Sequence, residues 1–194
     1  MTKVLAPIPT LLVVAACAVA APVSATTVVP LTFDELVQNA REVFIGEVVS
    51  THSAYADTRE GRAIVTLVTF RVDDALKGGL QTQTSLEFLG GTIGDVTMAI
   101  AGMPEFRVGD RDVVFVGNRS EASPVVGMMQ GRFRVMRDPI RGVDTVRGYD
   151  GRAVATLADI GRPRRFSMRP VASLTLSEFR AAILTRIQAE GGAR

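Results

Sequence analysis

Few residues in this sequence have the chemistry of a catalytic or metal site. His52 is the only histidine and Cys17 is the only cysteine. A Ser-His-Asp triad would have to use His52 as its base, and a zinc site needs several converging His, Cys or carboxylate ligands. We interpret His52, which lies between Thr51 and Ser53 after a predicted strand, as a surface loop histidine. The sequence therefore predicts no catalytic residue and no bound metal.

Two pairs of carboxylates and one glycine-rich segment are the remaining candidates for chemistry. Asp73-Asp74 and Asp110/Asp112 flank predicted strands, where charged side chains are normally solvated, so an acid–base pair is not favoured. Residues 90–94 (GGTIG) lack the Lys-Ser/Thr ending and the following helix of a phosphate-binding loop. We therefore predict no cofactor and no enzyme activity, with a hydrolase of unknown substrate as the enzymatic alternative.

The N-terminus has the pattern of an export signal. Lys3 provides a positive charge, residues 11–21 are apolar or small, and small residues precede Thr26 as signal peptidase requires. Residues 1–25 are therefore predicted to be a signal peptide. The alternative is that the sequence VAAC, which ends at Cys17, is a bacterial lipobox whose cysteine becomes lipidated. We expect an exported protein, either periplasmic or extracellular, or else an outer-membrane lipoprotein.

Composition indicates one folded domain without internal disulfides. The chain has 194 residues, of which 47% are hydrophobic, and this excludes general disorder and permits a sizeable core. The formal net charge is +2, and the positive charge is almost all Arg. We interpret this as compositional bias, because a nucleic-acid binder would need its cations clustered on one face. Because Cys17 lies in the targeting segment, no disulfide can form within the mature chain. Stability must therefore come from core burial.

Short segments in which apolar residues alternate with polar ones, or form continuous runs, predict a mainly β domain over residues 26–157. The expected strands are residues 42–50, 63–72, 83–89, 96–101, 113–116 and 125–136, the last broken at residues 130–131. Residues 146–154 contain Asp150-Gly151, a strong hairpin turn signal. Gly46 predicts a bulge in the first strand, and the polar residues 51–60 predict a loop after it. Residues 63–72 would span roughly 33 Å. Strands of this length usually coil, as in a small barrel.

Two Thr-x-x-Glu capping boxes predict a helix at each end of the β body. The first, at residues 32–35, begins a short helix, and the second begins a C-terminal amphipathic helix over residues 175–190. Residues 158–174, which connect the β body to the C-terminal helix, are rich in Arg and Pro and predict an extended strap. The C-terminal helix either docks on the barrel or binds a partner. Its apolar face consists of Leu176, Phe179, Ile183 and Ile187.

One loop is the candidate for partner binding. Residues 102–110 (GMPEFRVGD) lead into the strand at residues 113–116, where a continuous β-branched and aromatic run predicts burial on both faces. We expect the loop to form a rim of the barrel with an exposed Met103. The alternative is that the loop only closes the barrel, with Phe106 as a core plug. The candidate binding residues are Gly90, Gly91, Gly102, Met103, Pro104, Glu105 and Phe106.

Several segments resemble known groups of proteins. The opening of the netrin-like and tissue-inhibitor-of-metalloproteinase domains, which are five-stranded OB-type barrels, is similar to residues 40–49 (AREVFIGEVV), 70–72 (FRV) and 76–78 (LKG). A group of uncharacterised secreted bacterial proteins is similar to residues 89–91 (LGG), 102–110 and 127–135 (GMMQGRFRV). The resemblance implies an OB-like fold and export. It implies no activity, because Thr26 at the predicted mature N-terminus cannot replace the zinc-chelating cysteine of the inhibitors.

These inferences predict a small OB-like barrel, closed or partly open, with a short N-terminal helix and a C-terminal helix. Its expected function is that of a non-catalytic binding module of the bacterial cell envelope. The expected partner is an envelope or extracellular protein or glycan, and nucleic acid is not expected. Membrane contact is predicted only if Cys17 is lipidated, in which case a lipid-anchored structural envelope protein is the alternative function.

Overall fold

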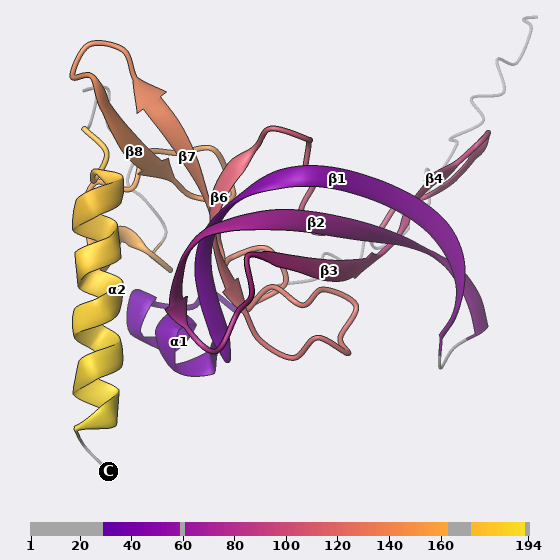
Figure 1. Cartoon of the computed structure of the whole chain (residues 1–194), viewed down its shortest axis with the longest axis horizontal. Helices are drawn as coiled ribbons and strands as arrows, with labels where there is room; N and C mark the ends of the chain where they lie inside the picture. Colours follow the sequence, from indigo (N-terminus) through magenta and orange to yellow (C-terminus); the bar gives the residue numbers. More distant parts are fainter. Residues whose placement is uncertain (1–28, 59–60, 163–171, 193–194) are drawn as a thin grey trace, which may run out of the picture.

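The structure, a computed structural model, describes residues 29–58, 61–162 and 172–192 (Figure 1). The elements in chain order are α1 (Phe33–Asn39), β1 (Glu42–Thr58), β2 (Gly61–Lys77), β3 (Gln83–Leu89), β4 (Gly91–Ile93), β5 (Val96–Met98), β6 (Arg111–Val116), β7 (Arg132–Asp138), β8 (Val143–Arg147), the 3-10 helix η1 (Leu157–Asp159) and α2 (Leu176–Gly191). The predicted mainly β class with a helix near each end is confirmed. The predicted signal peptide and most of the predicted strap lie outside the described residues.

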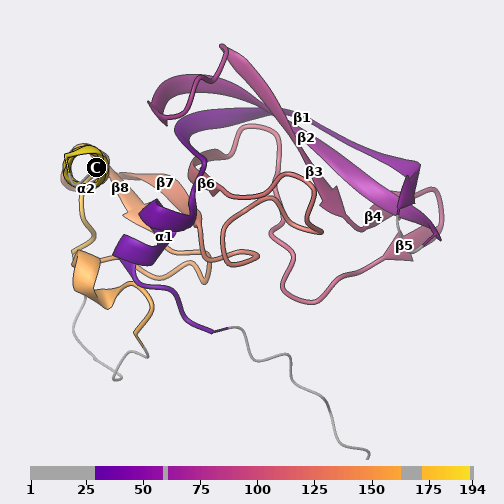
Figure 2. The same ribbon diagram turned by 90° about the horizontal axis from the view of Figure 1, so that it is seen from below.

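Six strands form one antiparallel sheet in the order β3-β2-β1-β6-β7-β8, and β4 and β5 form a separate hairpin. Strands β1, β2 and β3 arch away from the helices (Figures 1 and 2). Within the described residues no ladder joins the edge strands β3 and β8, so a closed barrel is not found. Irregular chain covers both edges instead: the Leu89 N–H donates to the Ala122 carbonyl at 2.8 Å, and the Val146 N–H donates to the Leu174 carbonyl at 3.0 Å.

The hairpin of β1 and β2 is longer than the sequence pattern predicts. Each strand has 17 residues, and the predicted loop at residues 51–60 is wrong because β1 continues to Thr58. Backbone pairing with β2 sustains this polar part of the strand, and the hydroxyls of Ser53 and Thr66 add a 3.0 Å bond across it. The bulge predicted at Gly46 is confirmed by a register shift there, where a Cβ would lie 2.6 Å from the Arg71 carbonyl oxygen.

Two other predicted strand segments are shorter or absent, and the strand at residues 96–101 ends at Met98. The hairpin turn predicted within residues 146–154 is present: Arg147, the last residue of β8, bridges to Ala153, and the Val154 N–H donates to the Val146 carbonyl at 3.4 Å. Residues 125–129 form turns, with a single bridge from Val125 to Val116. The reason lies at residues 127–128, since Gly127 and Met128 have φ angles of 63° and 68°, which no strand accommodates.

Both helices begin at the predicted capping boxes. In α1 the Glu35 N–H donates to the Thr32 hydroxyl at 3.3 Å, and the Thr32 N–H donates to the Glu35 carboxylate at 2.7 Å. In α2 the Thr175 N–H donates to the Glu178 carboxylate at 2.8 Å. These bonds from backbone and hydroxyl groups of the threonines lower the pKa of both glutamates. Within the described part of the chain, no helix combines the length and apolarity needed to cross a membrane.

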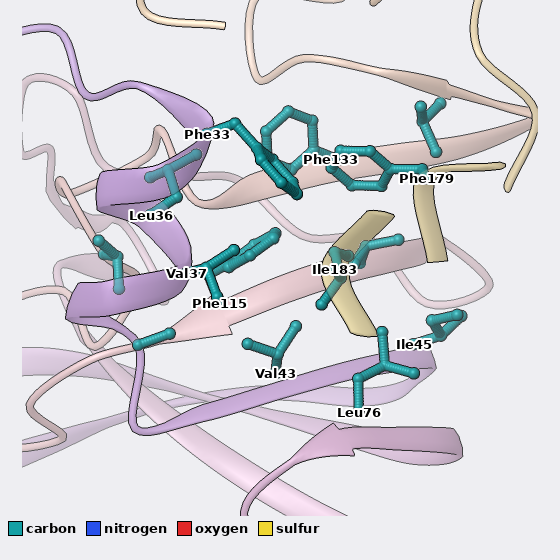
Figure 3. Close-up of a cluster of buried hydrophobic side chains, with 14 of the residues drawn as sticks. Phe33, Leu36, Val37, Val43, Ile45, Leu76, Phe115, Phe133, Phe179 and Ile183 are labelled. Carbon is teal, nitrogen blue, oxygen red and sulfur yellow. The ribbon is translucent and has the colours of Figure 1, made fainter. Parts of the chain in front are cut away.

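Two apolar clusters lie on opposite faces of the sheet. The helix-side cluster contains Phe179 and Ile183 of α2, both fully buried, so the predicted amphipathic helix docks on the sheet (Figure 3). The rings of this cluster pack at tilted angles, with the Phe133 and Phe179 centroids 4.8 Å apart and their planes inclined by 53°. Strand β6 serves both faces, as predicted, because Phe115 enters the helix-side cluster and Val114 the other. The inner cluster, under the arch, consists of Phe44, Val48, Val68, Phe70, Leu86, Phe88, Val114, Val116 and Val125.

Candidate functional site

A cleft of about 350 Å³, here called the rim cleft, opens at the end of the arch beside the β4–β5 hairpin. All of the predicted binding residues except Gly102 line it. A Cβ on Gly102 would instead lie 2.6 Å from the Cε of Met129, so this glycine packs against the turn before β7. The other lining residues are Thr66, Val68, Phe88, Leu89, Thr92, Thr97, Met98, Ala99, Ile100 and Arg107.

Two glycines allow the chain to cross closely over the β1–β2 hairpin at one wall of the rim cleft. Gly90 and Gly91 have φ angles of 100° and 141°, which favour glycine. A Cβ on Gly91 would overlap the hydroxyls of Thr66 and Ser53. The Thr66 hydroxyl donates to the Gly90 carbonyl at 2.7 Å, which ties the crossing to the strand beneath it. This wall is therefore set by backbone conformation.

The opposite wall is the loop at residues 103–106, and its packing differs from the expected exposed rim. Met103 is half-buried and packs against the inner cluster, so the expectation of an exposed Met103 is wrong. Phe106 is also half-buried, with its ring centroid 5.3 Å from that of Phe70 and 5.1 Å from that of Phe88. The loop thus fills the inner cluster with one side and faces the cleft with the other, and the Glu105 side chain remains exposed.

A buried arginine, called here the arginine clamp, fixes this loop. The Arg132 guanidinium bonds to Asp112 through Nε at 3.0 Å and Nη2 at 3.1 Å, and to Asp110 through Nη2 at 3.0 Å. Its Nη1 donates to the Glu105 carbonyl. Its Cζ atom lies 4.0 Å from the centroid of the Phe106 ring, a cation–π contact. The Arg132 side chain therefore contacts the loop at three places: the Glu105 backbone carbonyl, the Phe106 ring, and Asp110 in the turn that follows.

The carboxylates of the clamp are occupied by other donors as well. Asp110 accepts from Arg134 and from the Arg107 backbone N–H, the latter at 3.0 Å. Asp112 is completely buried, and this burial raises its pKa while the charge of Arg132 opposes the rise. The prediction that both carboxylates are solvated is therefore wrong for Asp112. It fails because pairing of β6 with β7 carries Arg132 to the inner face, where it meets Asp112.

The remaining candidates for chemistry are dispersed. The carboxylates of Asp73 and Asp74 pair with different cations: Asp73 accepts from Arg111 at 2.9 Å, and Asp74 accepts from Arg180 of α2 at 2.6 Å. His52 is exposed within β1 and therefore does not lie in a loop. Across the described residues no group of three or more His, Cys, Asp or Glu side chains could hold a metal ion.

Sequence reasoning missed a second cleft of about 280 Å³. The turn after β8 and residues around η1 line it, together with the apolar side chains of Phe133 and Leu31. Its lining also includes Tyr149, Arg152 and Arg162. No motif marks these positions, because the cleft joins segments that are distant in the sequence and individually resemble ordinary turns.

Comparisons with known proteins found no related protein. No protein-family model matches the chain, and neither curated proteins nor solved structures gave a match. The resemblance to OB-type domains therefore stays a prediction. The fold and site define a mainly β protein with two helices on one face of its sheet and a clamped cleft at the rim of the other.

Proposed function

We propose that this protein is an exported, non-catalytic binding module that holds a protein or glycan of the cell envelope in the rim cleft. The observation that carries the proposal is the preorganisation of the cleft. One wall is fixed by the crossing at Gly90 and Gly91, and the other by the arginine clamp. A site that is rigid before binding loses less conformational entropy when a ligand enters.

The lining of the rim cleft suits a ligand with both apolar and hydroxyl groups. Apolar surface comes from Val68, Phe88 and Phe106, and hydroxyls come from Thr92 and Thr97, which are 3.0 Å apart. Ligand sites commonly combine an apolar lining with a few placed polar groups. The carboxylates of Asp110 and Asp112 already accept hydrogen bonds from arginines, so they are poorly suited to act as a general acid or base. This supports a binding role for the rim cleft over a catalytic one.

We further propose that the arched half of the sheet acts as a partly open OB-like barrel. Strands β3, β2, β1 and β6 would form its wall, and residues 117–125 would take the place of a closing strand. That segment bonds to β3, where Arg119 Nη1 donates to the Ser85 carbonyl at 2.8 Å, and Val125 bridges to Val116 of β6. OB-type barrels bind ligands on one face and its rim loops, which is where the rim cleft lies.

The export component of the proposal rests on residues 1–25, with cleavage before Thr26 releasing the protein into the periplasm or the medium. Lipidation at Cys17 would instead anchor the same module to the outer membrane. The rim cleft would bind its partner in either location. Lipidation would therefore change only the compartment in which the protein and its partner meet.

The test is a capture experiment with a matched pair of substitutions. Thr97→Arg places a long charged side chain in the rim cleft from an exposed position, and Thr82→Arg places the same side chain on an exposed site away from it. Each purified protein is immobilised and exposed to solubilised envelope protein and to envelope glycan fragments, and the bound material is identified by mass spectrometry. We expect the wild type and Thr82→Arg to retain the same component and Thr97→Arg to lose it at an unchanged melting temperature. Equal retention by all three proteins would refute the rim cleft as the site.

A further inference from the structure

The outer half of β1 is an open strand edge. Strand β6 covers β1 only from Glu42 to Glu47, after which the Val48 N–H bonds to the Asp110 carbonyl at 2.8 Å. Beyond that point β1 continues to Thr58 along the arch, paired with β2 alone (Figure 1). Within the part of the chain that the structure describes, no strand pairs with the other side of residues 51–57, here called the arm edge.

The register shows which backbone groups the arm edge presents. The Ile64 carbonyl accepts from the Gly90 N–H at 2.7 Å, so the backbone groups of Ile64 face β3 and those of Val65 face β1. Val65 is opposite Ala54, whose backbone groups therefore face β2. Because these directions alternate along a strand, an outward N–H and C=O remain on each of Thr51, Ser53, Tyr55 and Asp57.

The arm edge lacks the devices that usually protect an open edge. Exposed edges are normally blocked by Lys, by Pro, by a bulge or by inward-pointing charges. Residues 51–57 (THSAYAD) contain neither Lys nor Pro, and the last irregularity in the register lies between Val48 and Ser50. Asp57 is the one acidic residue among them, and most of the segment is exposed. Such an edge is suited to pairing with another strand.

We propose that two copies of this chain pair through their arm edges, antiparallel, about a twofold axis at Ala54. In this register Thr51 lies opposite Asp57 of the partner subunit and Ser53 lies opposite Tyr55 of the partner subunit. Every outward residue of the arm edge then meets another outward residue, so all of the open backbone groups are paired. The interaction is isologous, as in most homodimers, and it joins the two sheets into one.

The side chains of the arm edge fit a second copy. Ala54 would face Ala54 of the partner subunit at a non-hydrogen-bonded position, where Cα atoms approach to about 4.5 Å and the two side chains are direct neighbours. Tyr55, which is 46% exposed, would face a small serine, and Asp57 would face a threonine, so no like charges are opposed. An edge this short buries little surface, and the dimer is therefore weak and concentration-dependent.

Charge substitutions at Ala54 test the pairing. We expect sedimentation velocity to show a monomer–dimer equilibrium for the wild-type chain and for Ala54→Gln, and monomers alone for Ala54→Lys and for Ala54→Glu. Mixing the Lys and Glu variants should restore the dimer, because opposite charges then face each other across the axis. Ala54 is exposed, so all three variants should keep the wild-type circular dichroism spectrum. A monomeric wild type, or dimers of Ala54→Lys alone, would overturn the proposal.

Cysteine crosslinking tests the register independently. In the proposed dimer Ala54→Cys places two thiols within the Cα separation that a disulfide requires, and Ala56→Cys leaves its two thiols about 13 Å apart. Mild oxidation should therefore crosslink the first variant between copies and leave the second uncrosslinked. The wild-type chain controls for any link through Cys17. Crosslinking of Ala56→Cys in preference to Ala54→Cys would refute the axis at Ala54.

Discussion

Replacing Arg132 by Met tests whether the arginine clamp holds the rim cleft in place. Met has a comparable length and no charge, so it leaves the fully buried Asp112 without its ion-pair partner. Removing one partner of a buried ion pair costs about 3–5 kcal/mol, whereas a whole domain is stable by only about 5–15 kcal/mol. At about 2–4 °C per kcal/mol for a chain of this size, we expect the melting temperature to fall by about 6–20 °C.

The pH dependence of this variant gives a second readout. Burial already raises the pKa of Asp112, and Arg132 is the group that opposes the rise. Without Arg132 the folded-state pKa rises further above the unfolded value, so the folded protein binds the proton more tightly than the unfolded chain. Stability is then lost as pH rises through the folded-state pKa and regained on acidification. Thermal melts of Arg132→Met at decreasing pH should therefore show partial recovery relative to the wild type.

Two further variants make the result decisive. Arg137→Met removes an exposed ion pair of 3.1 Å to Asp144, and this control should change stability by no more than about 0.5 kcal/mol. Asp112→Leu with Arg132→Met removes both buried charges and should be more stable than Arg132→Met alone. If Arg132→Met melts at the same temperature as the Arg137→Met control, the arginine clamp does not stabilise the loop.

Three further predictions concern processing, the core and the helix cap. Intact-mass analysis of envelope fractions should find a chain that begins at Thr26, and a lipid-modified chain that begins at Cys17 would contradict it. Phe115→Ala should destabilise the protein by about 3–5 kcal/mol in chemical denaturation, because it opens a cavity between sheet and helices; a cost near that of a surface substitution would show that the cluster repacks. The pKa of Glu178 is lower in the folded than in the unfolded protein, so its hydrogen bonds at the cap stabilise α2 above about pH 4.5. This stabilising contribution is lost as the pH falls further. Glu178→Gln should remove this contribution from the acid limb of the melting curve, and an unchanged limb would exclude it.

The sequence was sufficient wherever local chemistry decides the structure. The capping boxes at Thr32 and Thr175 place both helix starts correctly, because the reciprocal bonds involve residues only three apart. Strand β6 is predicted by its continuous apolar run, and the bulge by Gly46 within an apolar strand. In each case the determining contacts lie within one turn or one strand.

The sequence was insufficient where a distant partner decides. The outer half of β1 has the polar sequence of a loop. It is a strand because its backbone pairs with β2, which its own side chains do not indicate. Asp112 resembles a solvated strand end until Arg132 is brought beside it across the sheet. The candidate site shows both limits: the glycines and the loop meet at one cleft, but the burial of Met103 and Phe106 depends on the inner cluster.

The arginine clamp also makes the shape of the rim cleft depend on a distant part of the sheet. The β1–β2 hairpin is made of neighbouring segments and can pair without the rest of the sheet, since short loops close at little entropic cost. The clamp joins residues 20 to 27 positions apart, and Arg132 reaches Glu105 and Asp112 only when β7 lies beside β6. A chain that has formed the arch but not yet added β7 therefore has strands and no shaped cleft. Under the proposed function, a chain in that condition would lack its binding site, so partner binding would report the completed fold.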